Sequence, residues 1–192
     1  MQDNKIYHNI HQDIIDRCRE GEQKAQFQLY KLYYKAMFNA SYRILNNRMA
    51  AEDVMQESFF KAFDKINTYS GKVSFGAWLK KIVINQSLDE LKKNKIDDRF
   101  IEDEGVKLKE LNDKEDENDE TEQKFNIDDI KEKINDLPDG YRVVLSLYLL
   151  EGYDHDEISE ILNISSSTSR SQYTRAKNKL KKQLKEKTKS DE

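Results

Sequence analysis

The stretch from Tyr153 to Leu180, which reads YDHDEISEILNISSSTSRSQYTRAKNKL, contains two short helical patterns separated by a tight corner. The first pattern places three aliphatic residues on one face at helical spacing: Ile158, Ile161 and Leu162. Asn163 follows, and asparagine is one of the few non-glycine residues that tolerate the left-handed conformation ending many helices. Ser165 or Ser166 can then cap a second helix, because a serine hydroxyl accepts a hydrogen bond from its free backbone N–H groups. The stretch therefore predicts a helix-turn-helix.

The second helix of this pattern has one apolar face and one polar, basic face. The apolar face carries Tyr173, Ala176, Leu180 and Leu184. The polar face carries small and hydrogen-bonding residues: Ser167, Thr168, Arg170, Ser171, Gln172 and Arg175. Such a helix fits the DNA major groove, where arginine pairs with guanine, glutamine pairs with adenine, and hydroxyls reach phosphates or base edges. The alternative is a pair of antiparallel helices with a solvated outer face.

Composition favours an all-α protein of one or two small domains. The 192 residues include one proline and six glycines, so long helices can run without interruption. Hydrophobic and charged residues each make up 36%, which suits helices with narrow apolar stripes. The net charge is only -4, but residues 101–125 are strongly acidic and residues 165–189 strongly basic. This asymmetry is typical of a nucleic-acid-binding surface combined with an acidic linker.

No sequence feature indicates an enzyme, a cofactor, a metal site or membrane insertion. Cys18 is the only cysteine, which suits a reducing compartment and excludes a disulfide framework. The longest apolar run, residues 143–150, is far too short to span a bilayer. The sequence shows no catalytic nucleophile with an accompanying general base and no glycine-rich phosphate loop. The three histidines are interpreted as surface residues. We expect a cytoplasmic protein without catalysis of its own.

Helical periodicity recurs along most of the chain. It predicts helices over residues 11–20, 23–45, 50–66, 74–93, 127–137 and 139–150, before the helix-turn-helix. The many aromatic residues of the 23–45 helix are interpreted as core, although base stacking is the alternative. Residues 94–126 lose this periodicity and crowd acidic residues together. They are expected to form a flexible linker, either a solvating spacer or a mimic of nucleic acid inside a basic channel.

The predicted helix over residues 50–66 has an unusual outer face. One side is apolar and is expected to pack inward: Met55, Phe59, Ala62, Phe63 and Ile66. The opposite side combines polar residues with one large aromatic: Asp53, Gln56, Glu57, Phe60 and Asp64. Phe60 is either an interface anchor ringed by polar contacts or a side chain covered by a loop.

Three segments in order carry a family resemblance: AEDVMQESFFKAFDKI, then FGAWLKKIVINQSLDELKK, then, after the charged linker, LPDGYRVVLSLYLLEGYDHDEISEILNIS. Together they resemble bacterial RNA polymerase sigma factors of the extracytoplasmic-function (ECF) group, within the sigma-70 superfamily. The resemblance covers nearly the whole chain. It implies two small helical domains joined by a flexible acidic linker: region two over residues 1–95, the linker over 96–126, and region four over 127–187.

The resemblance also implies roles for individual residues. The polymerase-docking surface, which binds clamp helices of the largest subunit, corresponds to Asp53, Gln56, Glu57 and Phe60. The segments that open and read the minus-ten promoter element, where a base is flipped into a pocket, correspond to Tyr69, Lys80, Lys81, Asn85 and Asp89. The helix that reads the minus-thirty-five element corresponds to Ser166, Ser167, Thr168, Ser169, Arg170, Gln172 and Arg175. The acidic linker corresponds to a segment threaded along the polymerase's basic channel.

The resulting hypothesis is a promoter-specificity subunit that binds core RNA polymerase, recognises a two-part promoter and helps to melt it. Promoter DNA and core polymerase are its expected partners, and an anti-sigma factor is a further partner that the resemblance suggests. Ser169 stands where the family often has an aliphatic residue, which leaves the phase of the reading helix open by one residue. Two alternatives stay open: a stand-alone helix-turn-helix regulator, and a helical adaptor acting only through protein contacts.

Overall fold

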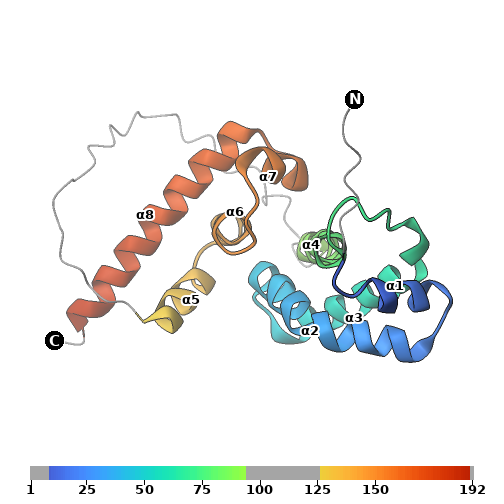
Figure 1. The fold of residues 1–192 in the computed structure, drawn as a ribbon. Helices are drawn as coiled ribbons and strands as arrows, with labels where there is room; N and C mark the ends of the chain where they lie inside the picture. Colours follow the sequence, from blue (N-terminus) through green and yellow to red (C-terminus); the bar gives the residue numbers. More distant parts are fainter. Residues whose placement is uncertain (1–8, 94–125, 191–192) are drawn as a thin grey trace. The chain divides into compact units, whose positions relative to one another are not determined.

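The computed structural model describes residues 9–93 and 126–190, and within these ranges all regular structure is helical (Figure 1). The chain divides into two compact units, Met1–Asn94 and Lys95–Glu192. The expected linker over 96–126 lies almost entirely outside the described residues. None of the described helices is long and apolar enough to cross a membrane.

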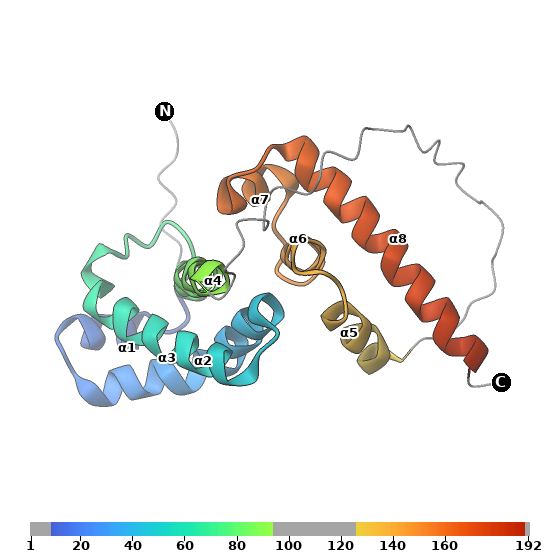
Figure 2. The same ribbon diagram turned by 180° about the vertical axis from the view of Figure 1, so that it is seen from behind.

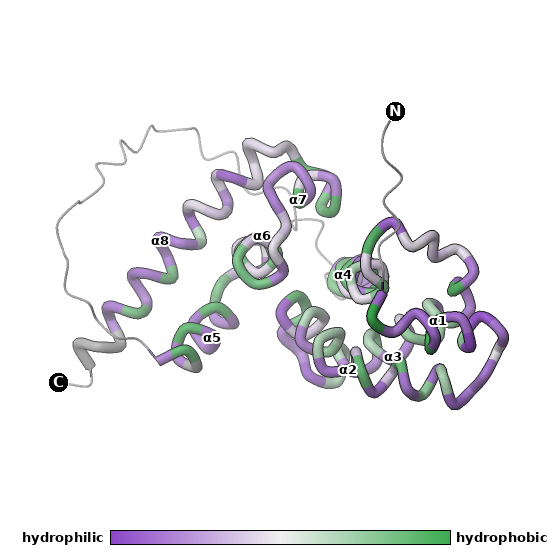
Figure 3. The backbone as a smooth tube through the Cα atoms, viewed as in Figure 1, coloured by the Kyte–Doolittle hydropathy of each residue, from purple (hydrophilic) through white to green (hydrophobic). Residues whose placement is uncertain are grey.

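The first unit is a bundle built around one long helix. Its elements are α1 (Gln12–Arg19), α2 (Gln23–Leu45), α3 (Arg48–Asp64), the short 3-10 helix η1 (Ile66–Thr68) and α4 (Phe75–Lys93). α2 packs against α1, α3 and α4, and the hydropathy colouring shows apolar residues alternating with polar ones along these helices (Figure 3). The core contains Ile15, Leu29, Met37, Phe59, Phe75, Leu79 and Val83, all at most 3% exposed.

The aromatic residues of α2 mostly serve this core. The rings of Tyr30 and Phe59 lie 4.9 Å apart in an edge-to-face arrangement, and those of Tyr33 and Phe75 lie 5.5 Å apart. Such pairs stabilise a core beyond the area that they bury. These two tyrosines are partly buried and pack against the core, which agrees with their interpretation as core residues rather than stacking platforms. Phe27 is an exception, because 57% of its surface is exposed.

Two consecutive asparagines make the sharp turn between α2 and α3. Asn46 ends α2 in the left-handed conformation, with a φ of 50°. Asn47 begins α3, and its side chain accepts a hydrogen bond from the backbone N–H of Ala50 at 3.1 Å. Asparagine suits both positions, because its short polar side chain tolerates positive φ and caps helix starts.

The second unit contains α5 (Ile127–Asn135), α6 (Asp139–Leu149), α7 (His155–Leu162) and α8 (Ser166–Ser190) (Figure 2). α6 and α7 both pack on the long helix α8, and α5 packs farther along it. Buried Arg142 fixes the corner between α5 and α6. Its guanidinium donates to the backbone oxygen of Leu137 at 3.2 Å and forms an ion pair with Asp139 at 2.5 Å.

The helix-turn-helix forms where the sequence predicts it. Asp154 caps α7 by accepting hydrogen bonds from the N–H groups of Asp156 and Glu157, and the Glu157 carboxylate accepts one from the N–H of Asp154. This reciprocal arrangement is a capping box. Asn163 ends α7 with a φ of 55°. Ser165 caps α8 by accepting from the N–H of Thr168 at 3.0 Å.

Burial of Cys18 gives a testable pH dependence. Burial raises the pKa of this thiol from about 9 to about 11, although Arg17 lowers it slightly. Because the thiolate is the reactive form, we expect iodoacetamide to alkylate the native protein at pH 8 about 100-fold more slowly than the urea-unfolded protein. The unfolded thiol ionises first as the pH rises. The free energy of unfolding should therefore fall between about pH 9 and 11.

The matched control is Cys18→Ala, compared by urea titration at pH 8 and pH 10.5. The variant should lose the part of the pH dependence that the thiol contributes. Equal alkylation rates for native and unfolded protein would show that Cys18 is accessible.

Candidate functional surfaces

The outer face of α3 holds the four residues predicted to bind polymerase, and all four are exposed. Phe60 is 75% exposed, so the alternative in which a loop covers it is wrong. Asp53, Gln56 and Glu57 surround it on the same helix. A large aromatic side chain that stays in water on a polar face resembles the anchors found at the centre of protein interfaces.

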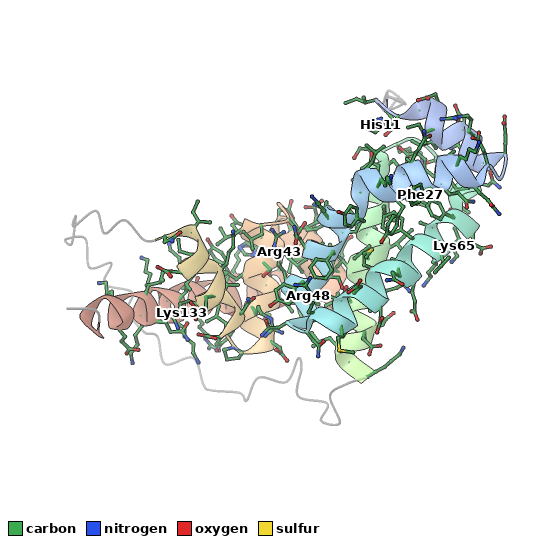
Figure 4. The ribbon with its side chains drawn as sticks, turned by 90° about the horizontal axis from the view of Figure 1, so that it is seen from below. His11, Phe27, Arg43, Arg48, Lys65 and Lys133 are labelled. Carbon is green, nitrogen blue, oxygen red and sulfur yellow. The ribbon has the colours of Figure 1, made fainter. Side chains whose placement is uncertain are left out.

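Phe60 borders an apolar groove that is lined by residues of α2 and α3. Phe27, labelled in Figure 4, lines the groove from α2. The groove has a volume of about 620 Å³ and is lined by Gln23, Gln26, Phe27, Tyr30, Gln56, Phe59, Phe60 and Phe63. The ring of Phe27 is partly shielded by Lys31, whose Nζ lies 4.5 Å from the ring centre. We call this groove, with the exposed rings of Phe27 and Phe60 in its lining, the docking groove.

Sequence reasoning missed Phe27 because it treated the aromatics of α2 as core. A signal was present, however. Ala25 and Leu29 are fully buried and lie four residues apart on one stripe of α2. Phe27 lies midway between them in the sequence, about 200° around the helix from each, and must therefore face away from that stripe.

The acidic residues of α3 face a second, polar depression. Asp53 and Glu57 line it together with Glu90 of α4, and its volume is about 440 Å³. Among the described residues, neither Asp53 nor Glu57 forms an ion pair. The docking groove is therefore flanked on one side by carboxylates that are available to a basic partner.

The predicted minus-ten residues of α4 share one exposed stripe. Lys81, Asn85 and Asp89 are exposed and spaced four residues apart, so they lie one above the other along the helix. Lys80 is half-buried on the neighbouring side. The amide of Asn85 and the ammonium of Lys81 have no bonding partner among the described residues. They can therefore serve as donors to an external ligand.

Tyr69 does not join this stripe. It is 3% exposed, and its hydroxyl lies 2.5 Å from the backbone oxygen of Val73 and 2.7 Å from Nδ2 of Asn9. Its ring packs against Phe75 and Trp78, with centroids 5.6 and 5.3 Å away. A side chain enclosed in this way cannot contact DNA directly, so the expected contact is replaced by an internal role.

On α8, the structure separates the predicted DNA-contacting residues into two groups. Ser167, Arg170 and Arg175 are exposed, and Ser166 and Thr168 are partly exposed. The other two face the interior: Ser169 is fully buried and Gln172 is 7% exposed. These two lie on the same helix stripe as buried Ala176. This determines which face of α8 points inward, a question that the sequence left open by one residue. They are not available for base contacts.

The buried side of this helix also corrects the interpretation of His155 as a surface residue. The His155 ring stacks on Tyr148 at 4.6 Å and meets Tyr173 edge-on at 5.6 Å. Its Nδ1 lies 2.9 Å from Oγ of Ser169. His155 therefore joins α6, α7 and α8, and Ser169 is polar because it provides this hydrogen bond.

The first turn of α8 is organised by hydroxyl groups. Oγ of Ser166 donates to Asp156 at 2.7 Å, whereas Arg170 lies 3.9 Å from the same carboxylate. Because both partners of the Arg170 pair are exposed, the ion pair contributes little stability and leaves Arg170 free to bind a phosphate. Thr174, which sequence reasoning missed, is exposed four residues after Arg170 and extends the same face.

One further titratable group lies at the helix-turn-helix. Burial raises the pKa of the Tyr153 phenol, and the nearby carboxylates of Glu151 and Glu157 raise it further. Tyr153 thus stays neutral at physiological pH. Its backbone N–H donates to the oxygen of Leu147 at 3.0 Å, which ties the start of the helix-turn-helix to α6.

The described residues form two all-helical units, the second built around a helix-turn-helix, the fold class of many DNA-binding proteins. Residues 29–96 match the family Sigma-70 region 2, and residues 127–180 match Sigma-70 region 4. The ECF RNA polymerase sigma factor SigW of Bacillus subtilis is 30% identical over 90% of this chain and 95% of its own length. The ECF RNA polymerase sigma-E factor of Haemophilus influenzae is 28% identical over 86% and 90%. The chain therefore belongs to the ECF family of RNA polymerase sigma factors.

Solved structures show the same fold. The sigma factor RpoE in complex with the anti-sigma factor NepR, from Bartonella quintana, aligns with a TM-score of 0.55 at 22% identity, over 82% of this chain and 95% of that one. CnrH in complex with the cytosolic domain of CnrY aligns with a TM-score of 0.53 at 19% identity, over 91% and 97%.

The neighbouring phenylalanines of α3 provide a direct test of this geometry. Phe59→Ala should lower the free energy of unfolding by about 3 to 4 kcal/mol, because Phe59 is 3% exposed and leaves a cavity. Phe60→Ala should change it by less than about 0.5 kcal/mol, because Phe60 is already in water. Urea titration monitored by far-ultraviolet circular dichroism measures both. Equal destabilisation by the two changes would contradict the orientation of α3.

Proposed function

We propose that three surfaces of this sigma factor act together in promoter recognition. The outer face of α3 and the docking groove bind core RNA polymerase. The exposed stripe of α4, with the loop that precedes it, reads the minus-ten element and assists melting. The first turns of α8 read the minus-thirty-five element. In this proposal residues 1–95 form region two, 96–126 the linker and 127–187 region four, and the chain acts in the cytoplasm without catalysis of its own.

The exposed phenylalanine of α3 carries the polymerase-docking part of the proposal. Keeping Phe60 in water has no benefit for the isolated protein, since burying such a ring is favourable by about 1.5 to 3 kcal/mol. Here it stands beside a groove of about 620 Å³ and next to the carboxylates of Asp53 and Glu57. An apolar anchor bordered by negative charge fits a partner surface that carries both apolar and basic residues.

The DNA-binding part rests on the position of α8. Its N-terminus has free backbone N–H groups and a positive dipole end, both of which favour phosphate. Arg170 and Thr174 lie on the exposed face that continues from this end, while Ser169 and Gln172 hold the helix to the unit. Exposed Lys81 and Asn85 on α4 supply the corresponding phosphate and base-edge donors for the minus-ten strand.

An anti-sigma factor is a further proposed partner. The matched RpoE structure is a complex with the anti-sigma factor NepR, and the matched CnrH structure is a complex with the cytosolic domain of CnrY. An inhibitor that covers the docking groove would bury the same exposed phenylalanines that polymerase uses. Competition between core polymerase and the inhibitor would follow directly.

The docking surface is tested by transcription with purified core RNA polymerase and genomic promoter fragments. Transcripts should require this protein. Asp53→Arg combined with Gln56→Ala should abolish them, and Phe60→Ala should weaken core binding at least about tenfold, because a central aromatic anchor is lost. Fluorescence anisotropy of the labelled protein measures the binding.

Glu52→Arg is the matched control for the charge reversal. Glu52 is also exposed but lines a different depression, beside Phe38 and Arg48. It should leave core binding within about twofold of the unchanged protein, since it lies outside the anchor region. Tight, specific DNA binding by the protein alone, without any new transcripts, would favour the stand-alone regulator. If the protein neither binds DNA alone nor produces new transcripts, the result would favour a helical adaptor that acts only through protein contacts.

Arg170 provides a test of the minus-thirty-five surface. Arg170→Ala should reduce the slope of log affinity against log salt concentration by about one for holoenzyme on promoter DNA, because one phosphate contact is lost. Lys179→Ala, an equal loss of charge nine residues farther along α8, should leave the slope unchanged. If both variants reduce the slope equally, Arg170 contributes only to the general positive field.

A further inference from the structure

We infer that Tyr69 and Asn9 are positioning residues for the loop between α3 and α4, residues 65–74. In this inference they fix the loop in the shape that receives the minus-ten strand, and neither contacts DNA. The inference rests on the proposed minus-ten role of α4 and its preceding loop. It assigns a function to the segment around α1, which lies outside the matched range of 29–96.

Tyr69 is the centre of the loop and is held on its inner side. Its hydroxyl donates to the backbone oxygen of Val73 and accepts from Nδ2 of Asn9 at 2.7 Å. A buried hydroxyl that lacked these partners would be costly, so the two bonds hold the loop and Asn9 in one arrangement. The ring itself is enclosed by Phe75 and Trp78.

Asn9 connects the middle of the loop to its end. Its Oδ1 accepts from the backbone N–H of Phe75 at 2.9 Å, at the first residue of α4. The same amide group therefore contacts Tyr69 through its nitrogen and α4 through its oxygen. Asn9 is 6% exposed, so water competes little for either bond.

Arg19 holds Tyr69 from the opposite end of α1. Its Nη2 donates to the backbone oxygen of Tyr69 at 2.8 Å, and its guanidinium carbon lies 5.9 Å from the centre of the ring. Nη1 is oriented by Asp16 at 2.9 Å. Asn9 precedes α1 and Arg19 is its last residue. The helix therefore braces Tyr69 with a side chain at each end.

The brace sets the positions of the exposed residues beside Tyr69. Thr68, Ser70 and Lys72 are exposed. They alternate along the chain with Tyr69 and with Gly71, whose φ is 74°. A loop that receives an unstacked base binds more tightly if its bound shape already exists before binding. Loss of the brace should therefore weaken DNA binding although the contacting side chains are unchanged.

The test uses holoenzyme assembled from core polymerase and the full chain. The probe is a fluorescent single-stranded oligonucleotide carrying the non-template minus-ten sequence of a promoter that the protein transcribes. Tyr69→Phe keeps the ring but removes the hydroxyl, and Asn9→Ala removes the bridging amide. Each should weaken oligonucleotide binding about five- to tenfold, the factor that one or two hydrogen bonds provide. The double variant should bind the oligonucleotide no more weakly than the single variant with the larger loss, because both changes disrupt the same hydrogen-bonded unit.

Three further variants make the result specific. Tyr34→Phe removes a hydroxyl from the same unit, away from the loop, and should leave binding unchanged. Arg19→Gln acts on a side chain that is partly exposed at a helix end, so it should fold, and it should weaken binding in the same direction. Asn85→Ala removes a proposed direct contact. Core affinity should be unchanged in all of them, and Trp78, the only tryptophan, should report a changed environment in Tyr69→Phe.

The possible outcomes separate the two levels of the proposal. If Asn85→Ala weakens binding but the folded Tyr69→Phe, Asn9→Ala and Arg19→Gln proteins bind normally, the positioning role is wrong and the minus-ten surface stands. If none of them affects binding, the proposed minus-ten surface is wrong and the positioning role fails with it. Additive losses in the Asn9 and Tyr69 double variant would show independent sites and would also overturn the inference.

Discussion

Burial of α2 is the constraint on which the first unit depends. This helix is apolar around much of its circumference, so it must be covered on several sides at once. α1, α3 and α4 provide that cover, and each uses only one face to do so. The opposite faces of α3 and α4 are then free for partners. One central helix therefore explains why a unit of fewer than 100 residues can present both the groove that we propose for polymerase and the α4 stripe that we propose for DNA.

The positions of the helices could be predicted because their ends have local chemical causes. The left-handed conformation of Asn163 and the caps at Asp154 and Ser165 depend on residues only a few positions apart. The outward position of Phe60 likewise follows from its spacing relative to the apolar residues of α3, whereas only the structure shows that no described loop covers it. These features require no knowledge of what lies across the core.

The remaining features depend on contacts between distant segments, which the sequence does not display. Ser169 and Gln172 look like DNA-contacting residues because they are polar, yet Ser169 is buried to bond His155 of another helix. Each residue of a helix is rotated by about 100° from the last, so an error of one position turns an inner residue outward. The burial of Tyr69 is hidden from the sequence for the same reason, since its partner Asn9 lies 60 residues away in the chain.

Buried polar groups in this protein mark the places where helices must meet in one geometry. Apolar surfaces tolerate small shifts, whereas a buried hydroxyl or a partly buried imidazole is satisfied only when its partner is correctly placed. His155 and Ser169 set the angle of the helix-turn-helix in one unit, and Tyr69 and Asn9 set the α3–α4 loop in the other. Both networks lie directly beneath a proposed DNA-binding surface. In the proposed function, these buried contacts hold the two surfaces in one geometry, and on α8 the hydroxyl bonds of the first turn add to them.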